Sequence, residues 1–180
     1  MMASVTWAPS QIREVANGQW GTLREPRIGV MIHFDGSASD PGAVAWFSDP
    51  ACKVSYQLLV LDDGSFVRIA PDSARAYHAG VCKPSSPQFS YTDANSAFYS
   101  VSLATSDKVD VTPLQTLTVA WLTRRYFERE GWPVTDGWRI TSHRVEAYPR
   151  GRKSDPEGAD LKNPILAVDD IRQLLGRVVL

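Results

Sequence analysis

Two apolar runs that each carry a histidine near the carboxyl end constrain the fold of this chain most. One runs from Ile28 to Phe34 and holds His33, and the other runs from Trp138 to His143. Short apolar runs bounded by turn residues are typical of buried strands. In an α/β sheet, side chains at the ends of such strands open into the crevice where sites are built. We therefore expect both imidazoles to border such a crevice.

The remaining pattern predicts a mixture of strands and helices without internal repeats. Asp62-Asp63-Gly64 predicts a hairpin turn between strands at residues 55–61 and 65–70, because Asp-Gly favours the backbone conformations of a tight turn. A further strand is expected at residues 98–105. Asp40-Pro41 predicts the start of a short helix, with the aspartate as its cap and proline at the first helical position.

The clearest helix is predicted from residue 112 to about residue 130. A capping-box pattern begins at Thr112, and Gly131 supplies the stop. Apolar residues spread around much of the helix circumference, which indicates burial on more than one side. A last helix is expected to follow Asn163-Pro164 and to end near Gly176. This pattern favours an α/β or α+β fold and leaves the strand order open.

Length and composition fit one soluble globular domain. Of the 180 residues, 43% are apolar and 22% are charged, which suffices for one substantial core. The 19 basic and 20 acidic residues give a net charge of −1, so nothing suggests nucleic acid or an anionic membrane as partner. The start of the chain lacks a signal-peptide pattern, and no apolar run is long enough to span a bilayer. We expect a monomer that is made in the cytoplasm.

Cys52 and Cys82 leave two alternatives open. They could form one bridge, but two cysteines in a chain of this size are more often reduced and buried. The segment from Cys82 to Asn95 has three serines, two prolines and no apolar periodicity, which predicts a loop. This loop either borders a substrate groove or is an ordinary surface loop.

Three residues together form a candidate metal site. A lone histidine that closes an apolar run is more often a satisfied core residue than a ligand, and an aspartate before proline is most often a turn residue. His33, His143 and Asp155 nevertheless supply two imidazoles and a carboxylate, the ligand set of a catalytic zinc site. Such a site leaves a position for water and lowers the pKa of that water toward ~7, which permits attack on an amide carbonyl.

Four blocks of the sequence follow one another in a characteristic order. They are the strand with His33, residues 54–65, residues 76–80, and His143 followed by Lys153-Ser154-Asp155-Pro156. In order and spacing they resemble the type 2 N-acetylmuramoyl-L-alanine amidases, which include phage lysozyme-like amidases, recycling amidases and peptidoglycan recognition proteins. The resemblance implies a single catalytic domain in residues 1–180, with its core at about 25–178. It also implies an α/β fold with a central mixed β-sheet flanked by helices and a zinc cleft above the sheet.

The resemblance also implies roles for individual residues. Zn²⁺ would be held by His33, His143 and Asp155, and the amide between N-acetylmuramic acid and L-alanine of peptidoglycan would be hydrolysed. Lys153 stands where the family places a group that stabilises the oxyanion; without the motif, a solvated turn lysine would be the better explanation. His78 matches a histidine near the cleft, and we expect it to line the substrate site or to make a structural hydrogen bond.

Tyr56 and Ser102 concern the remaining catalytic group. Tyr56 matches a tyrosine that bonds the zinc water or the oxyanion in phage-type members, although an aromatic residue in an apolar strand is usually part of the core. Ser102 stands where recycling-type members carry a glutamate, so the general base is left unassigned. A second departure is Glu157, which stands where glycine is common in the family.

The missing glutamate favours a lytic enzyme such as a phage endolysin. Two alternatives stay open, a recycling amidase that acts on soluble anhydromuropeptides and a non-catalytic peptidoglycan-binding module. The presence of all three candidate ligands argues against the second alternative.

Overall fold

The computed structural model describes residues 5–15, 17–37, 39–106, 111–157, 166 and 168–180. Its strands are β1 (Val5–Thr6), β2 (Gln11–Glu14), β3 (Trp20–Thr22), β4 (Gly29–Phe34), β5 (Leu58–Val60), β6 (Phe66–Arg68), β7 (Ala74–Ala76), β8 (Phe98–Leu103), β9 (Ile140–Ser142) and β10 (Val178–Val179). Its α-helices are α1 (Asp40–Ser48), α2 (Ala94–Ala97), α3 (Pro113–Glu130), α4 (His143–Glu146) and α5 (Val168–Leu175), and a 3-10 turn covers Gly137–Arg139.

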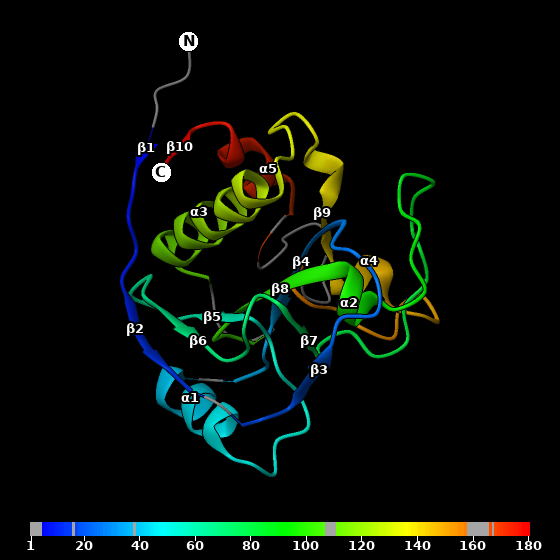
Figure 1. Ribbon diagram of the computed structural model, residues 1–180. Helices are drawn as coiled ribbons and strands as arrows, with labels where there is room; N and C mark the ends of the chain where they lie inside the picture. Colours follow the sequence, from blue (N-terminus) through cyan, green and yellow to red (C-terminus); the bar gives the residue numbers. More distant parts are fainter. Residues whose placement is uncertain (1–4, 16, 38, 107–110, 158–165, 167) are drawn as a thin grey trace.

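A mixed sheet of six strands forms the centre of the molecule, in the order β2-β6-β5-β8-β4-β9 (Figure 1). The strands β5, β8, β4 and β9 run parallel to one another, whereas β5 and β6 form an antiparallel hairpin. Two short pairs, β1 with β10 and β3 with β7, lie outside this sheet. The fold is therefore a single domain with a mixed sheet flanked by helices, as the resemblance implies.

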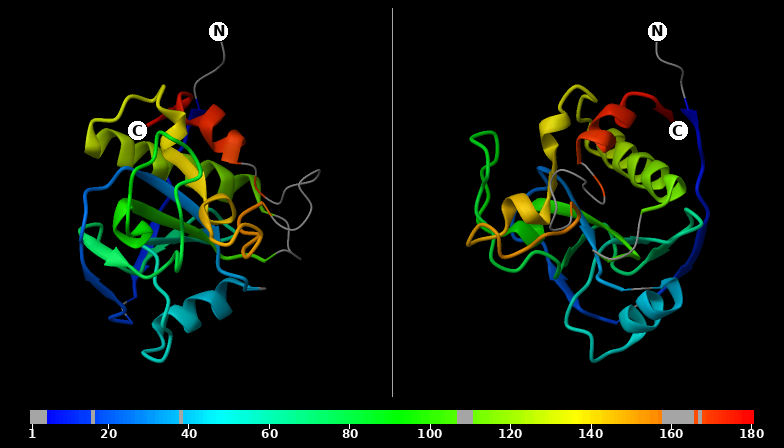
Figure 2. Two further views of the ribbon diagram at one scale, coloured as in Figure 1. Left: turned by 90° about the vertical axis from the view of Figure 1, so that its right-hand side faces the viewer. Right: turned by 180° about the vertical axis from the view of Figure 1, so that it is seen from behind.

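The two faces of the sheet have different roles. Along β4, Val30 and Ile32 belong to the large core cluster under α3 and α5. Because side chains alternate along a strand, Met31 and His33 lie on the opposite face. The ribbon views show α3 and α5 on one side of the sheet and α1 on the other (Figures 1 and 2). The histidine of β4 therefore lies away from the main core.

The helix α3 is buried on two sides, which confirms the prediction from its apolar distribution. One side contacts β5 and β8 and another contacts α5. The Thr112 hydroxyl accepts the backbone N–H of Gln115 at 3.0 Å, and the Gln115 side chain accepts the backbone N–H of Thr112 at 2.9 Å, so the capping box is present. Gly131 ends the helix with a φ of 69°, the left-handed conformation that glycine adopts without steric cost.

Other expected elements are confirmed with changed boundaries. The hairpin around Asp62-Asp63-Gly64 forms, with strands shorter than expected. The cap of α1 is Ser39 and not Asp40, because the Asp40 carboxylate instead accepts the backbone N–H of Asp62 at 3.0 Å. The helix α5 ends before Gly176 as predicted, but its expected start after residue 163 lies outside the described residues.

Both cysteines are free, Cys52 buried and Cys82 half-buried. The reduced alternative therefore holds in this structure. None of the helices in the described ranges combines the length and apolar character needed to cross a bilayer.

Candidate active site

Strand pairing brings the two candidate histidine ligands together. His33 lies near the end of β4, and Ile32 is in register with Ser142 of the neighbouring strand β9. The Ser142 hydroxyl accepts the backbone N–H of Val145 at 3.2 Å and caps α4. The sequence pattern predicted His143 as the last residue of a strand. In the structure it is instead the first residue of the short helix α4. The two imidazole rings lie 4.7 Å apart between centroids.

Asp155 faces both imidazoles with one oxygen atom. Its Oδ2 lies 3.0 Å from Nδ1 of His33 and 3.1 Å from Nδ1 of His143. The Asp155 carbonyl accepts the backbone N–H of Arg144 at 2.8 Å, which connects the loop that carries Asp155 to α4. All three side chains are buried, and one ligand atom from each lies within 4.8 Å of the others.

The Nε2 atom of each of these two histidines also has a hydrogen-bond partner. Nε2 of His143 lies 2.8 Å from the carbonyl oxygen of Ala79, and Nε2 of His33 lies 3.0 Å from Nδ1 of His78. The side-chain oxygen of Asn95 accepts the backbone N–H groups of His78 and Ala79 at 2.9 Å and 2.8 Å. Partners of this kind fix the ring orientation and the tautomer of metal-binding histidines.

Burial and hydrogen bonding set the protonation states of the cluster. Burial lowers the pKa of His33 to about 4, although the hydrogen bond to Asp155 opposes this effect. Burial also disfavours the charged form of Asp155, but hydrogen bonding with His143 and His33 outweighs it and holds the pKa of this carboxyl well below its usual range. His33 is therefore neutral and Asp155 ionised at neutral pH, which are the forms that bind a metal ion.

The donor set fits zinc. Two imidazole nitrogens and one carboxylate oxygen suit this ion, and three protein ligands are typical of a catalytic site. Both Nδ1 atoms are directed at the carboxylate, and each Nε2 atom lies beside a potential acceptor, which favours the tautomer with the proton on Nε2 and Nδ1 available for a metal ion. His33, His143 and Asp155 could therefore form a metal site.

Two neighbouring hollows open onto this cluster. One, of about 360 Å³, is lined by Tyr56, Trp46 and Asp35 together with His143 and Asp155. The other, of about 310 Å³, is lined by Ala79, Gly80 and Asn95. His78, His143, Arg152 and Lys153 line both hollows. The cleft therefore runs past the cluster, with two cationic side chains along it.

Tyr56 is a core residue and a cleft residue at the same time. It precedes β5 and is 7% exposed, with its ring 5.0 Å from that of His33 and 5.4 Å from that of Phe47. Burial and the nearby Asp155 carboxylate raise the pKa of Tyr56 above its usual value. The phenol keeps its proton at neutral pH and can serve as a hydrogen-bond donor.

Ser102 lies directly beside the histidine of β4. It is in register with His33 on the adjacent strand β8, and its hydroxyl is fully buried. The position where the sequence comparison expected a glutamate in some relatives is thus next to the cluster. Here this position carries a serine hydroxyl, so it supplies no carboxylate to the cleft.

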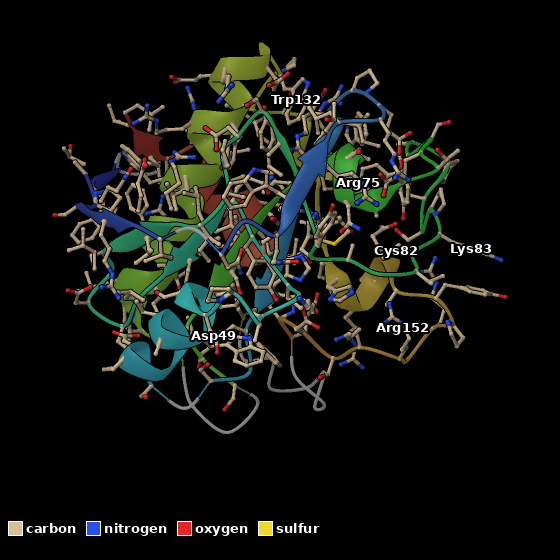
Figure 3. All side chains as sticks on the ribbon, turned by 60° about the horizontal axis from the view of Figure 1, so that its bottom comes forward. Asp49, Arg75, Cys82, Lys83, Trp132 and Arg152 are labelled. Carbon is tan, nitrogen blue, oxygen red and sulfur yellow. The ribbon has the colours of Figure 1, made fainter. Side chains whose placement is uncertain are left out.

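Three residues of the site were not found from the sequence. Asn95 lies in the short helix α2 and has no distinctive local signal, because its partners at positions 78 and 79 are set by the tertiary fold. Arg152, labelled in Figure 3, is an exposed residue. Its guanidinium donates to the carbonyl of Val81 at 2.9 Å and to that of Ala79 at 3.3 Å. Asp35, two residues after His33, lines the cleft with a buried Oδ2 that has no partner among the described residues. Its position just after a strand could have signalled it.

Part of the segment from Cys82 to Asn95 borders a different hollow. Ser85 and Phe89 line a groove of about 770 Å³ next to β9 and α5. Buried Glu146 of α4 anchors this loop, since its carboxylate accepts the Tyr91 hydroxyl at 2.6 Å and also the hydroxyl of Ser85. Only Asn95, at the end of the segment, reaches the cleft beside the histidines.

Comparison with known proteins supports the geometry. A family model described as N-acetylmuramoyl-L-alanine amidase matches residues 24–158, well over half of the chain. The chain belongs to the N-acetylmuramoyl-L-alanine amidase family. Membership supports N-acetylmuramoyl-L-alanine amidase activity, with peptidoglycan as the substrate. A search of curated protein sequences gave no significant match.

Solved structures of low sequence identity share the fold of this amidase. A selenomethionine derivative of AmpD aligns with a TM-score of 0.72 and 23% identity, over 97% of this chain and 99% of the other. AmiA from Staphylococcus aureus, a hydrolase solved with its ligand, aligns with a TM-score of 0.65 and 14% identity, over 98% of this chain and 84% of the other. A mutant endolysin from Bacillus subtilis aligns with a TM-score of 0.63 and 17% identity, over 94% of this chain and 100% of the other.

Replacement of Asn95 tests how the Nε2 atoms of His33 and His143 are held. Asn95→Ala leaves two buried backbone N–H groups unpaired, so we expect the free energy of unfolding to fall by about 1–3 kcal/mol and metal affinity to fall with it. Asn95→Asp keeps an acceptor oxygen and should retain most of both properties. Urea unfolding and zinc titration measure the two effects. Wild-type stability and affinity in Asn95→Ala would contradict this role.

Proposed function

We propose that this amidase is zinc-dependent and that it acts as a lytic enzyme on peptidoglycan, cleaving the amide between N-acetylmuramic acid and L-alanine. The observation that carries the proposal is the convergence of two buried imidazole Nδ1 atoms on one oxygen of Asp155. Family membership supports the bond that is cleaved. The catalytic domain is proposed to comprise residues 1–180, with its core at about 25–178.

His33, His143 and Asp155 are proposed to hold the zinc ion. When bound, zinc supplies Lewis-acid activation of water and of the substrate carbonyl near neutral pH. His78 Nδ1 lies 3.0 Å from His33 Nε2, and with the proton on that Nε2 the Nδ1 of His33 would be available to the ion. The carbonyl of Ala79 is the corresponding partner for Nε2 of His143. His78 also lines both hollows, which supports the proposal that it contacts the substrate.

Lys153 is proposed to stabilise negative charge on the carbonyl oxygen. Its side chain is exposed, lines both hollows and lies two residues before Asp155. Attack on an amide carbonyl places charge on oxygen, and a fixed cation beside that oxygen lowers the barrier. The exposed position lets the ammonium reach a substrate that lies in the cleft.

Tyr56 is proposed to donate a hydrogen bond to the oxyanion or to the attacking water. Its protonated hydroxyl belongs to a ring that packs against His33, so it acts next to the metal site. The short side chain of Ser102 supports this assignment, because it leaves the space beside His33 without a carboxylate. The same observation favours a lytic enzyme over a recycling amidase.

Product analysis tests the reaction and its setting. The purified protein is incubated with intact sacculi and, separately, with soluble anhydromuropeptides, and products are identified by mass. A lytic amidase releases stem peptides that begin with L-alanine from sacculi and acts faster on sacculi than on fragments. Preference for fragments would make it a recycling enzyme. No release from either substrate by the zinc-loaded protein would make it a binding module.

Metal analysis tests the ligand set. We expect about one zinc ion per chain, as for a catalytic site with three protein ligands, and loss of activity with a chelator. His33→Ala, His143→Ala and Asp155→Ala should each remove both zinc and activity. Stoichiometric zinc in all three variants would refute the assignment.

Lys153→Ala provides the matched control for these variants. It should keep the zinc but slow turnover on the order of 100-fold, as is typical for the loss of one oxyanion donor. Wild-type turnover in the folded variant would return Lys153 to the role of a solvated turn lysine.

Replacement of Tyr56 separates catalysis from packing. Tyr56→Phe removes only the hydroxyl, so zinc content and melting temperature should barely change while sacculus lysis falls sharply. A residue with only a packing role would show the reverse, with activity kept and at most about 1 kcal/mol of stability lost with a buried hydrogen bond. Ser102→Ala is the control and should leave lysis nearly intact.

A further inference from the structure

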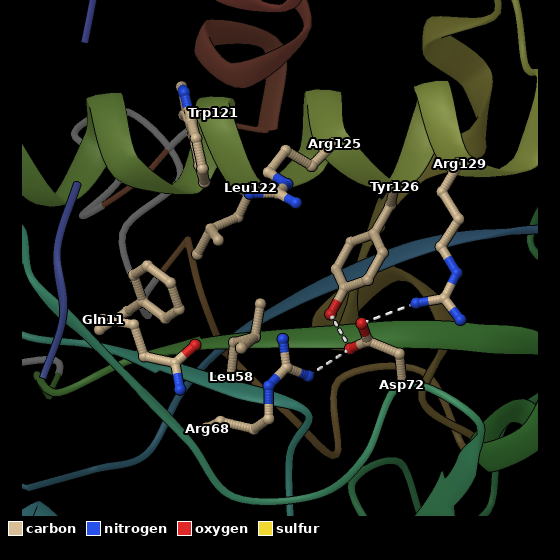
Figure 4. Close-up of a pocket in the computed structure, with 10 residues that line it drawn as sticks. Gln11, Leu58, Arg68, Asp72, Trp121, Leu122, Arg125, Tyr126 and Arg129 are labelled. Carbon is tan, nitrogen blue, oxygen red and sulfur yellow. Dashed lines mark hydrogen bonds and ion pairs between the residues drawn. The ribbon is translucent and has the colours of Figure 1, made fainter. Parts of the chain in front are cut away.

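A separate hollow lies on the opposite face of the sheet from the histidine cluster. It occupies about 350 Å³ between α3 and the β5-β6 hairpin (Figure 4). Its floor is apolar and deeply buried, formed by Leu58, Phe66 and Leu122. These residues belong to the core cluster under α3, whereas His33 lies on the other side of β4. No role in the amidase reaction accounts for this hollow.

Three arginines and a single aspartate give this hollow its charge. Arg68, Arg125 and Arg129 line it, and Asp72 is the one carboxylate among the lining residues. Asp72 accepts from Arg68 at 2.6 Å and from Arg129 at 2.7 Å. The Tyr126 hydroxyl donates to the same carboxylate at 3.0 Å. Asp72 is therefore fully engaged, and the lining carries more positive than negative charge.

Arg125 is the one lining arginine that makes no ion pair with the described residues. No carboxylate among the described residues lies within ion-pair distance of its guanidinium, which instead lies 5.0 Å from the centre of the Trp121 ring. Glu14 and Glu130 approach the other two arginines only at 3.9 Å, from outside the lining. The close-up shows the Arg125 and Arg68 guanidiniums directed into the hollow from opposite sides (Figure 4).

We propose that this hollow binds an organic phosphate monoester. A guanidinium presents parallel N–H donors that match the oxygens of phosphate, and two of them facing one space suit a doubly charged anion. The volume is in the range of small-molecule sites, so it has room for more than the phosphate group. The apolar floor and the half-buried Trp121 ring provide contacts for the organic part.

Titration with two anions tests the site. The zinc-loaded full chain is titrated with phenyl phosphate and with inorganic phosphate, followed by calorimetry or by NMR shifts. We expect saturable binding that weakens with salt, and tighter binding of phenyl phosphate than of inorganic phosphate. Arg125→Ala should weaken both about tenfold or more, as for the loss of one charge-assisted contact. Arg125→Lys keeps the positive charge but loses the paired N–H donors of the guanidinium. Its affinity should lie between those of the wild type and Arg125→Ala.

Controls keep the result separate from the amidase reaction. Arg125 is exposed and makes no ion pair with the described residues, so Arg125→Ala should keep the wild-type melting temperature and amidase rate. Arg24→Ala, at another exposed arginine after β3, should bind phenyl phosphate like the wild type. Absence of saturable binding, or equal affinity in Arg125→Ala, would overturn the site. Equal affinity for the two anions would overturn the organic part of the ligand.

Discussion

The contact of one Asp155 oxygen with two buried imidazoles is the interaction on which the site depends. A carboxylate in this position loses its hydration, and a buried charge without partners would take up a proton instead. The two histidines offset that cost and hold the carboxylate ionised. This requires β4, the start of α4 and the loop that carries Asp155 to meet at one point, and the contact of Asp155 with the Arg144 N–H closes that arrangement.

The remaining polar groups around the cluster follow from the same requirement. An imidazole that offers Nδ1 to a metal must have its other nitrogen protonated and paired. Ala79 and His78 provide those partners, and Asn95 fixes both residues through their backbone N–H groups. A chain segment distant in sequence from every ligand therefore determines how the ligands point. The apolar side chains of the opposite sheet face, packed under α3, keep the strands rigid enough for this.

Local patterns predicted the elements whose signals are contained within them. The capping box and Gly131 bound α3 because each acts on backbone groups a few residues away. Three local details were predicted wrongly, and in one of them a distant partner competed. Asp40 does not cap α1, because the hairpin at Asp62 takes its carboxylate. The strand before His143 ends early, because Ser142 caps a helical turn. Tyr56 lies before β5 rather than within a strand.

By itself, the sequence determined the family, the mixed α/β fold and the composition of the candidate site, since residue types and their order are read directly from the chain. Tertiary structure decided which atoms face one another: Nδ1 rather than Nε2 of each histidine, and one carboxylate oxygen shared by both. It also introduced Asn95, Arg152 and Asp35, whose partners are brought together only by strand pairing and loop packing. Distances between groups far apart in the chain depend on the whole packed structure, and no local spacing encodes them.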